Sequence, residues 1–177
     1  DPRQSLGAAY AHELARRGVV TLSPDNAGNG ARDVAPEEAV RGCELLWRRL
    51  NHVGLDLTGF RIFELMAAVN LLERLPDVHP GRIGAAGLSG GCWLSQVLTA
   101  LDDRIRAVVL SGYYSTFEQT AWVGHCLCHH PKGIGLLCDM PDLSALIAPR
   151  PLFVESGRQD VPYPVEPAFF MTQEAYR

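Results

Sequence analysis

The segment around residues 82–101 limits the possible folds more than any other part of the sequence. Arg82-Ile83-Gly84-Ala85-Ala86-Gly87-Leu88 is a short apolar run, thin in side chains, that predicts a buried strand. A helical pattern over residues 91–101 follows almost at once. Very few residues are left to turn the chain from strand to helix. We therefore expect a sharp turn at Ser89 with a strained backbone.

Short apolar runs and helical patterns alternate along the chain, which favours an α/β fold with a mostly parallel sheet flanked by helices. Strands are predicted at 18–22, 82–88, 107–110 and 151–155, and residues 113–141 are predicted to be irregular. Helices are predicted at 2–17, 36–51, about 59–75, 91–101, in a short stretch capped by Asp142, and after Pro167. No repeat or second domain is visible, so we expect residues 1–177 to form a single domain.

Composition excludes several classes of protein. The apolar share of 47% and the charged share of 20% are ordinary for a globular chain. A net charge of -4 argues against nucleic acid as a partner. No apolar run approaches the roughly 20 residues that span a bilayer, so no membrane association is expected. The five cysteines are expected to be reduced thiols. The sequence predicts neither the compartment nor the oligomeric state.

Gly87-Leu88-Ser89-Gly90-Gly91 matches G-x-S-x-G, the pattern that holds a nucleophilic serine at a turn between strand and helix. We expect the two flanking glycines to avoid collisions with neighbouring backbone in so tight a turn. The N-terminus of the following helix favours a developing negative charge. The backbone N–H of Gly90 is therefore the predicted oxyanion-hole donor.

A nucleophilic serine needs a base, and the base needs an acid to orient it. In proteins that hold a nucleophilic serine at a strand-to-helix turn of this kind, the acid follows the serine along the chain and precedes the histidine. Asp160 lies in the loop after the predicted strand 151–155 and is the candidate acid. Glu155 lies within that strand and is a weaker candidate. The alternative role for Asp160 is that of an ordinary turn aspartate.

The catalytic histidine is missing from the expected position. All six histidines precede Asp160, so an internal base such as His125, His129 or His130 would need a permuted chain order. The simpler hypothesis is truncation, with a cut or processed start, a fold incomplete at both termini and the histidine beyond Arg177. On this hypothesis, the 177-residue chain alone is inactive.

Several segments together resemble the acetyl xylan esterase-like, dienelactone-hydrolase-related branch of the α/β-hydrolases. The resemblance covers nearly the whole chain. It is most specific from Met140-Pro141-Asp142-Leu143 through Ile147-Ala148-Pro149-Arg150-Pro151 to Glu155-Ser156-Gly157 and Asp160. The other segments are Glu13-Leu14-Ala15-Arg16-Arg17-Gly18, Ser23-Pro24-Asp25, Arg82-Ile83-Gly84, Ala100-Leu101-Asp102-Asp103-Arg104-Ile105 and His125-Cys126-Leu127-Cys128.

The resemblance implies an α/β-hydrolase fold in which Ser89 is the nucleophile, Asp160 the triad acid and Gly90 an oxyanion donor. It also implies hydrolysis of a small-molecule or carbohydrate ester, often an acetyl group on a plant polysaccharide, without a cofactor. The chain departs from the family at His79, where relatives usually carry Asp, and at Cys92, where glycine is frequent. A prolyl-oligopeptidase-type serine peptidase and a non-catalytic remnant of the fold are the alternatives.

His125-Cys126-Leu127-Cys128-His129-His130, with Cys138 nearby, could also be interpreted as a zinc site. Structural zinc sites usually take two spaced pairs of Cys or His ligands. Here the candidate ligands crowd together and no second pair exists. We therefore expect no bound metal.

Two further patterns have modest functional interpretations. Gly28-Asn29-Gly30 follows a predicted strand, but it lacks the glycine spacing and the lysine of phosphate-binding loops, so a plain turn is expected. Aromatic side chains follow the strand 107–110 and could either line an acyl or sugar pocket or pack in the core. They are Tyr113, Tyr114, Phe117 and Trp122.

Overall fold

A three-stranded parallel sheet organises the protein. The structure is a computed structural model that describes residues 6–34, 41–122, 125–157 and 165–177. The strands β1 (Ile83–Leu88), β2 (Ile105–Ser111) and β3 (Leu152–Glu155) lie in the order β1-β2-β3. Leu88 pairs with Ser111, which pairs in turn with Glu155, so the three strands end together at one edge of the sheet.

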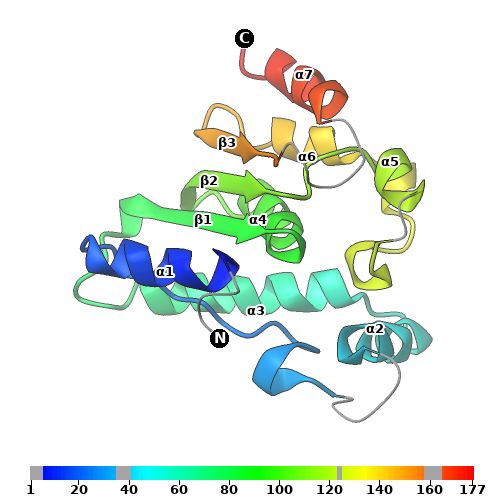
Figure 1. Ribbon diagram of the computed structural model, residues 1–177, viewed down its shortest axis with the longest axis horizontal. Coiled ribbons are helices and arrows are strands. Elements are labelled where there is room, and N and C mark those ends of the chain that lie inside the picture. Colours follow the sequence, from blue (N-terminus) through cyan, green and yellow to red (C-terminus); the bar gives the residue numbers. More distant parts are fainter. Residues whose placement is uncertain (1–5, 35–40, 123–124, 158–164) are drawn as a thin grey trace.

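Seven described helices surround this sheet (Figure 1). They are α1 (Leu6–Arg16), α2 (Gly42–His52), α3 (Leu57–Leu72), α4 (Gly90–Leu101), α5 (Phe117–Trp122), α6 (Met140–Ala145) and α7 (Glu166–Glu174). Short 3₁₀ turns are η1 (Gly30–Arg32), η2 (Pro80–Arg82), η3 (Leu127–His129) and η4 (Ile134–Leu136). Among the described residues, no helix has the length and apolarity needed to cross a membrane.

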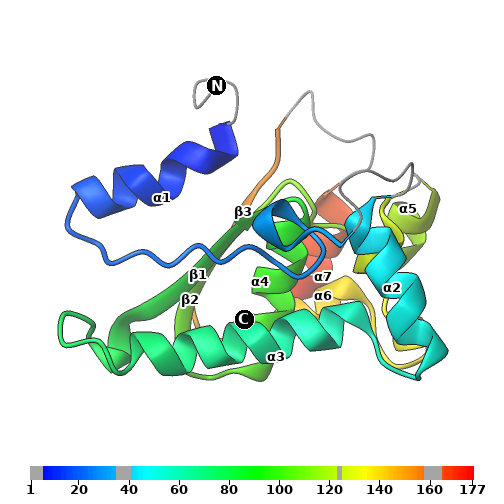
Figure 2. The ribbon, with the colours of Figure 1, turned by 90° about the horizontal axis from the view of Figure 1, so that it is seen from below.

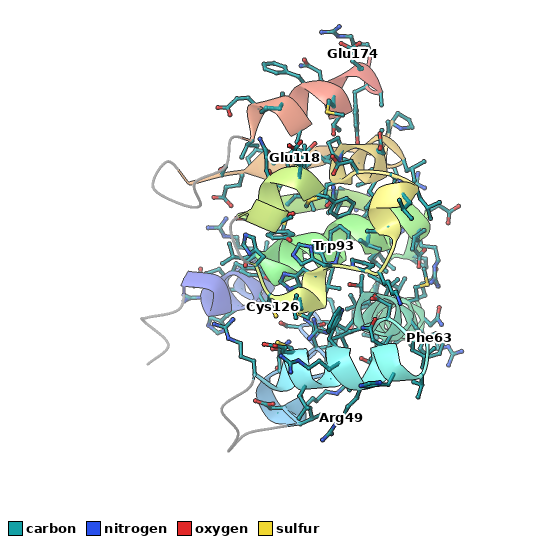
Figure 3. The ribbon with its side chains drawn as sticks, turned by 90° about the vertical axis from the view of Figure 1, so that its right-hand side faces the viewer. Arg49, Phe63, Trp93, Glu118, Cys126 and Glu174 are labelled. Atoms are coloured by element: carbon teal, nitrogen blue, oxygen red, sulfur yellow. The ribbon has the colours of Figure 1, made fainter. Side chains whose placement is uncertain are left out.

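Helix α4 forms the centre of the molecule, and its residues 92–99 are all buried. It packs on β1 and β2, and on α3 and α6 from its other sides. Trp93 has no exposed surface and lies at the middle of the packed layers, whereas Phe63 of α3 points outward with 71% of its surface exposed (Figure 3). The Trp93 indole N–H donates to the hydroxyl of Thr58, which ties α4 to the start of α3.

The opposite face of the sheet is more open. Helix α1 lies on this side (Figure 2). Its residues Tyr10 and Leu14 face β1 across a cavity of about 460 Å³. In-register Val109 and Phe153 stay 37% and 62% exposed on this face. Thus α4 covers one face closely, and α1 covers the other only loosely.

The structure confirms most of the predicted elements in the second half of the chain and corrects others. The prediction of a buried strand at 18–22 is wrong. Val19 and Leu22 are 48% and 43% exposed, and the segment lies across the 460 Å³ cavity from β1. A strand needs a hydrogen-bonded neighbour, and none of the described strands pairs with this segment.

Two helix starts also differ from prediction. Helix α2 starts at Gly42, because Arg41 has a non-helical backbone with ψ 136°, and the first part of the predicted helix, residues 36–40, lies outside the described residues. Helix α6 is capped by Asp139 rather than Asp142, whose carboxylate instead accepts from the Asp139 N–H to complete a capping box. The region 113–141 was predicted to be irregular, but within it α5, η3 and η4 are helical.

His79 shows how one departure from the family pattern is accommodated. Its ring nitrogen Nδ1 accepts a hydrogen bond from the Gly81 N–H at 3.0 Å and caps η2. An aspartate carboxylate could accept the same bond, so the substitution preserves the turn before β1.

Candidate active site

Ser89 has the strained backbone that the sequence predicts. It is exposed at the end of β1, with φ 55° and ψ -115°, and α4 begins at the next residue. Among the described residues, it is the one non-glycine residue with positive φ. Its N–H donates to the carbonyl of Ser111 at 2.8 Å, which fixes the turn to the end of β2. A left-handed serine costs conformational energy, and such strain is typical of functional positions.

Two of the three glycines around Ser89 are sterically constrained, each by a different neighbour. A Cβ at Gly87 would lie 2.0 Å from the carbonyl oxygen of Gly91, so glycine is required there. The same expectation for Gly91 is wrong, because a Cβ at that position would have none of the described residues within 4 Å outside its own helix backbone and chain neighbours. At Gly90, a Cβ would lie 2.6 Å from Nε2 of His129. Gly90 is therefore constrained by a residue distant in sequence.

The N–H of Gly90 lies in the first turn of α4. Amides in the first turn of a helix have no acceptor within the helix, and the helix dipole makes this end partly positive. They are suited to stabilising an oxyanion beside the exposed Ser89 hydroxyl. The geometry is thus compatible with the donor role predicted for Gly90.

The candidate acid, Asp160, lies outside the described residues. The chain leading to it can be followed as far as Gly157. The Glu155 carbonyl accepts from the Gly112 N–H at 3.1 Å, so β3 ends next to the end of β2. The chain that leads to Asp160 therefore leaves β3 at the carboxyl end of the sheet. Ser89 lies at the same end, next to β1, and β2 separates the two strands. Glu155 itself is exposed at the end of β3.

The three loop histidines are poorly suited to act as the base. His129 packs against Gly90 and, edge to face, against Tyr113 with ring centroids 5.3 Å apart. Burial lowers the pKa of His129 to about 4, and its Nδ1 has no hydrogen-bond partner among the described residues. A triad base needs a carboxylate at that nitrogen. Burial also lowers the pKa of His125 and of His130.

A cavity of about 510 Å³ opens beside the serine turn. The first turn of α4 forms one wall, and His129 and the buried Arg61 form others. The loop with Gly28-Asn29-Gly30 also borders it and turns into η1. The Arg61 guanidinium holds this loop by donating twice to the Ala27 carbonyl, at 3.0 and 2.6 Å.

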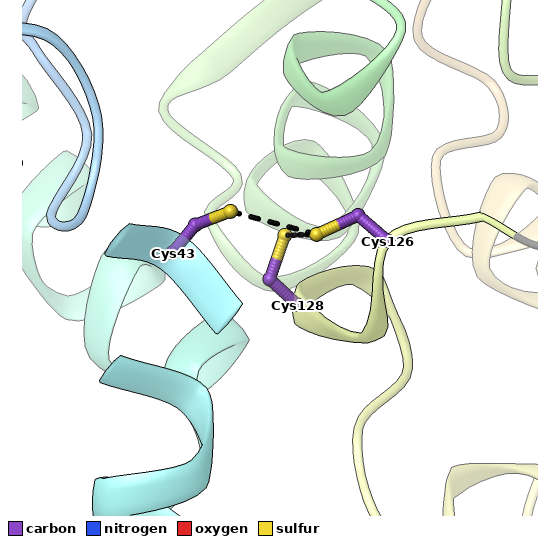
Figure 4. Close-up of side chains that lie close together, drawn as sticks. All are labelled: Cys43, Cys126 and Cys128. Carbon is purple, nitrogen blue, oxygen red and sulfur yellow. Dashed lines mark hydrogen bonds between the residues drawn. The ribbon is translucent and has the colours of Figure 1, made fainter. Parts of the chain in front are cut away.

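Three cysteines meet in the wall of the same cavity (Figure 4). Cys126 Sγ lies 3.5 Å from Cys43 Sγ and 3.0 Å from Cys128 Sγ. The hydrogen bond from Cys128 lowers the pKa of Cys126, while burial raises the pKa of Cys43. Proximity along the chain groups Cys126 and Cys128 with Cys138 and gives no indication of Cys43. Cys43 lies in the first turn of α2, 83 positions before Cys126, and nothing in its local sequence indicates this contact.

Two of the four aromatic candidates are fully buried. Tyr113 and Tyr114 are each 1% exposed, and the Tyr114 hydroxyl bonds with Thr172 and donates to the Ala168 carbonyl. Phe117 packs edge to face on Trp93. Core packing thus accounts for these three rings, while the side chain of Trp122 lies outside the described part.

A parallel sheet with a left-handed, exposed serine at the turn from strand to helix defines the α/β-hydrolase fold. Two of the three comparisons with known proteins agree with this fold, and the third finds no match. No family model matches the chain. YtaP of Bacillus subtilis, named as a hydrolase, is 25% identical over an alignment of 162 residues that covers 89% of this chain and 52% of that protein.

Solved structures show the same fold. An acetyl xylan esterase, so described, from Bacteroides fragilis has a TM-score of 0.84 at 19% identity, covering 99% of this chain and 48% of that one. A glucuronoyl esterase from Solibacter usitatus has a TM-score of 0.57 at 20% identity, covering 69% and 36%. The chain spans about half the length of the first of these relatives. The predicted fold and the resemblance to α/β-hydrolase esterases are confirmed.

Proposed function

We propose that this chain carries the nucleophile of a carboxylic ester hydrolase that works through a Ser-His-Asp triad. The observation that carries the proposal is the backbone of Ser89, at φ 55° and ψ -115°, exposed at the carboxyl edge of a parallel sheet. A serine with a purely structural role has no reason to occupy this strained conformation, and Gly87 and Gly90 are both constrained around it.

The proposed reaction is acyl transfer to water. Ser89 Oγ attacks the ester carbonyl and gives its proton to a histidine, while the Gly90 N–H stabilises the oxyanion. The histidine returns the proton to the departing alcohol, leaving an acyl-serine. Water then attacks this acyl group, and the acid and Ser89 are released.

Asp160 is the proposed acid, and the histidine is proposed to follow it in the chain order of this fold, beyond Arg177. Support for Asp160 comes from β3, whose end lies at the same sheet edge as Ser89. Support for a histidine outside the 177 residues comes from His129, because its lowered pKa and the lack of a hydrogen-bond partner for its Nδ1 within the described part of the chain suit packing rather than proton transfer.

The proposed substrate is an acetyl ester carried by a carbohydrate. The Bacteroides fragilis structure described as an acetyl xylan esterase matches 99% of this chain, whereas the glucuronoyl esterase matches 69% with a lower TM-score. The greater coverage and higher TM-score of the first match favour acetyl esters over glucuronoyl esters.

A fluorophosphonate probe on the full-length protein that contains this chain tests the proposal. The wild type should be labelled, with the label on Ser89, and Ser89→Ala should abolish labelling. Ser23→Ala is the matched control, because Ser23 is also exposed but lies far from the turn along the chain. Equal labelling of the wild type and Ser89→Ala would refute the nucleophile role.

Substrate tests then separate the alternatives. The wild type should release acetate from acetylated xylan and from an acetyl aryl ester, and should leave a prolyl peptide amide uncleaved. Cleavage of the amide with no ester hydrolysis would indicate a prolyl-oligopeptidase-type enzyme. A protein that neither reacts with the probe nor hydrolyses any ester would be a non-catalytic remnant.

A further inference from the structure

Three thiols from two distant parts of the chain converge on one point. Cys43 comes from the first turn of α2, Cys126 from the loop before η3, and Cys128 from η3 itself. Their three Sγ atoms all lie within 4.8 Å of one another. Cys43 and Cys128 are 6% and 3% exposed, and Cys126 is half-buried. Figure 4 shows the three sulfurs pointing toward a common centre.

The spacing of the sulfurs suits a shared metal ion. A tetrahedral zinc ion with Zn–S bonds of about 2.3 Å separates its sulfurs by about 3.8 Å. The two separations that involve Cys126, 3.0 and 3.5 Å, are somewhat shorter than this value, and the Cys43 and Cys128 sulfurs lie within 4.8 Å of each other. Small side-chain adjustments would therefore bring all three sulfurs to bonding distance. Covalent disulfides are absent from this group, since all three cysteines are free.

The surroundings can satisfy the rest of the coordination. The three cysteines line the 510 Å³ cavity, which leaves room for a water molecule as a fourth ligand. Three thiolates and one Zn²⁺ carry a net charge of about -1. Arg61 and Arg41 line the same cavity, and their positive charge offsets that of the complex.

We propose that Cys43, Cys126 and Cys128 together bind one Zn²⁺ ion as a three-thiolate site, with water as the fourth ligand. On binding, three thiols release their protons to solvent as three Zn–S bonds form. The ion would join the first turn of α2 to η3. Because His129 of η3 packs against Gly90, it would hold the wall of the cavity next to the serine turn. The site is independent of the proposed ester hydrolysis.

The first experiment is a titration of the reduced, metal-free full-length protein that contains this chain with Co²⁺, followed by Zn²⁺. Co²⁺ should produce a thiolate-to-metal charge-transfer absorption that saturates at one equivalent, and Zn²⁺ should displace it. Cys43→Ser, Cys126→Ser and Cys128→Ser should each weaken Zn²⁺ affinity at least about tenfold, because each removes a ligand. Cys138→Ser is the matched control and should bind like the wild type, since Cys138 lies outside the cluster.

A second measurement needs no variant and so does not depend on whether a variant folds. Alkylation of the wild type, mapped by mass spectrometry, should show that saturating Zn²⁺ protects Cys43, Cys126 and Cys128 but leaves the labelling of Cys138 unchanged. Ser89→Ala should bind Zn²⁺ normally, which separates this site from the hydrolase proposal. Absence of a charge-transfer band, equal protection of Cys138, or undiminished affinity in Cys43→Ser would overturn the proposal.

Discussion

The serine turn and the cysteine cluster border the same cavity, but the chain builds them in opposite ways. The serine turn is encoded by five consecutive residues, 87–91, whose conformation is decided mainly by local backbone sterics. The cysteine cluster joins Cys43 to Cys126, which lie 83 positions apart, and exists only because α2 packs against η3. Local strain can thus be inferred from a motif, whereas a site assembled by packing cannot.

The largest expected effect comes from removing the nucleophile. In the full-length protein, Ser89→Ala should lower kcat/KM for an acetyl aryl ester by about 10⁴- to 10⁶-fold, because the covalent step is lost. Steady-state kinetics measure this, with Ser23→Ala expected to stay within about twofold of the wild type. A loss below about tenfold in Ser89→Ala would mean that the strained turn has no catalytic role.

The local origin of the turn is tested by two matched glycine substitutions. Gly87→Ala should destabilise the fold by about 3 kcal/mol or more, because its Cβ would lie 2.0 Å from the Gly91 carbonyl oxygen. Gly91→Ala meets no neighbour and should be neutral or stabilise by up to about 1 kcal/mol through helix propensity. Urea unfolding measures both free energies. Similar values for the pair would contradict the assigned role of Gly87.

The contact between the two regions is tested by a double-mutant cycle. Gly90→Ala should cost about 1–3 kcal/mol, because its Cβ would lie 2.6 Å from Nε2 of His129. In a His129→Ala background the same change should cost about 1 kcal/mol less, since the colliding ring is gone. Additive free energies of unfolding would show that the two residues do not press on each other.

The smallest effect is expected at Asp102, which caps the carboxyl end of α4. This position serves as a reference for the changes at the serine turn. Hydrogen bonds from Arg104 lower the pKa of Asp102 in the folded state. The stabilisation from Asp102 is therefore present above the unfolded-state pKa of about 3.9 and is lost as pH falls through the lower folded-state pKa. Asp102→Asn should cost on the order of 1 kcal/mol at pH 7, because the partner Arg104 is partly exposed.

The check is the unfolding free energy of the wild type and Asp102→Asn across pH. The difference in unfolding free energy between the two proteins should shrink as the pH falls below about 4. The destabilisation by Gly87→Ala should persist at every pH. A gap that widens on acidification would reverse the inferred direction of the Asp102 pKa shift.

The sequence predictions succeeded where a local pattern decides the structure and failed where contacts between distant segments decide it. The elements β1, α4, β2 and β3 were predicted near their observed bounds, because each has a strong local pattern. The segment 18–22 has an equally apolar, β-branched pattern, yet it is exposed and unpaired among the described strands. Strand formation depends on a neighbour to pair with, which a single segment cannot specify.

The candidate site divides in the same way. The strained turn at Ser89 and the constraint at Gly87 were predicted from the motif alone and are observed, whereas the catalytic roles of Ser89, Gly90, Asp160 and a later histidine stay predictions. The constraint on Gly90 was not predictable, because it comes from His129 in a distant loop. Cys43 was missed for the same reason, while Cys138, closer in sequence to Cys126, lies outside the cluster.

By itself, the sequence determined the order of β1, α4, β2 and β3, the position of the serine turn and the resemblance to ester hydrolases. The elements depend on hydrophobic periodicity and the turn on backbone sterics over a few residues, while the resemblance depends on the similarity of short segments to those of a known family. Only the tertiary structure decided which thiols meet, which imidazole packs on Gly90 and which faces of the sheet are covered. Those contacts join residues far apart along the chain, and their positions result from the packing of whole helices rather than from any local pattern.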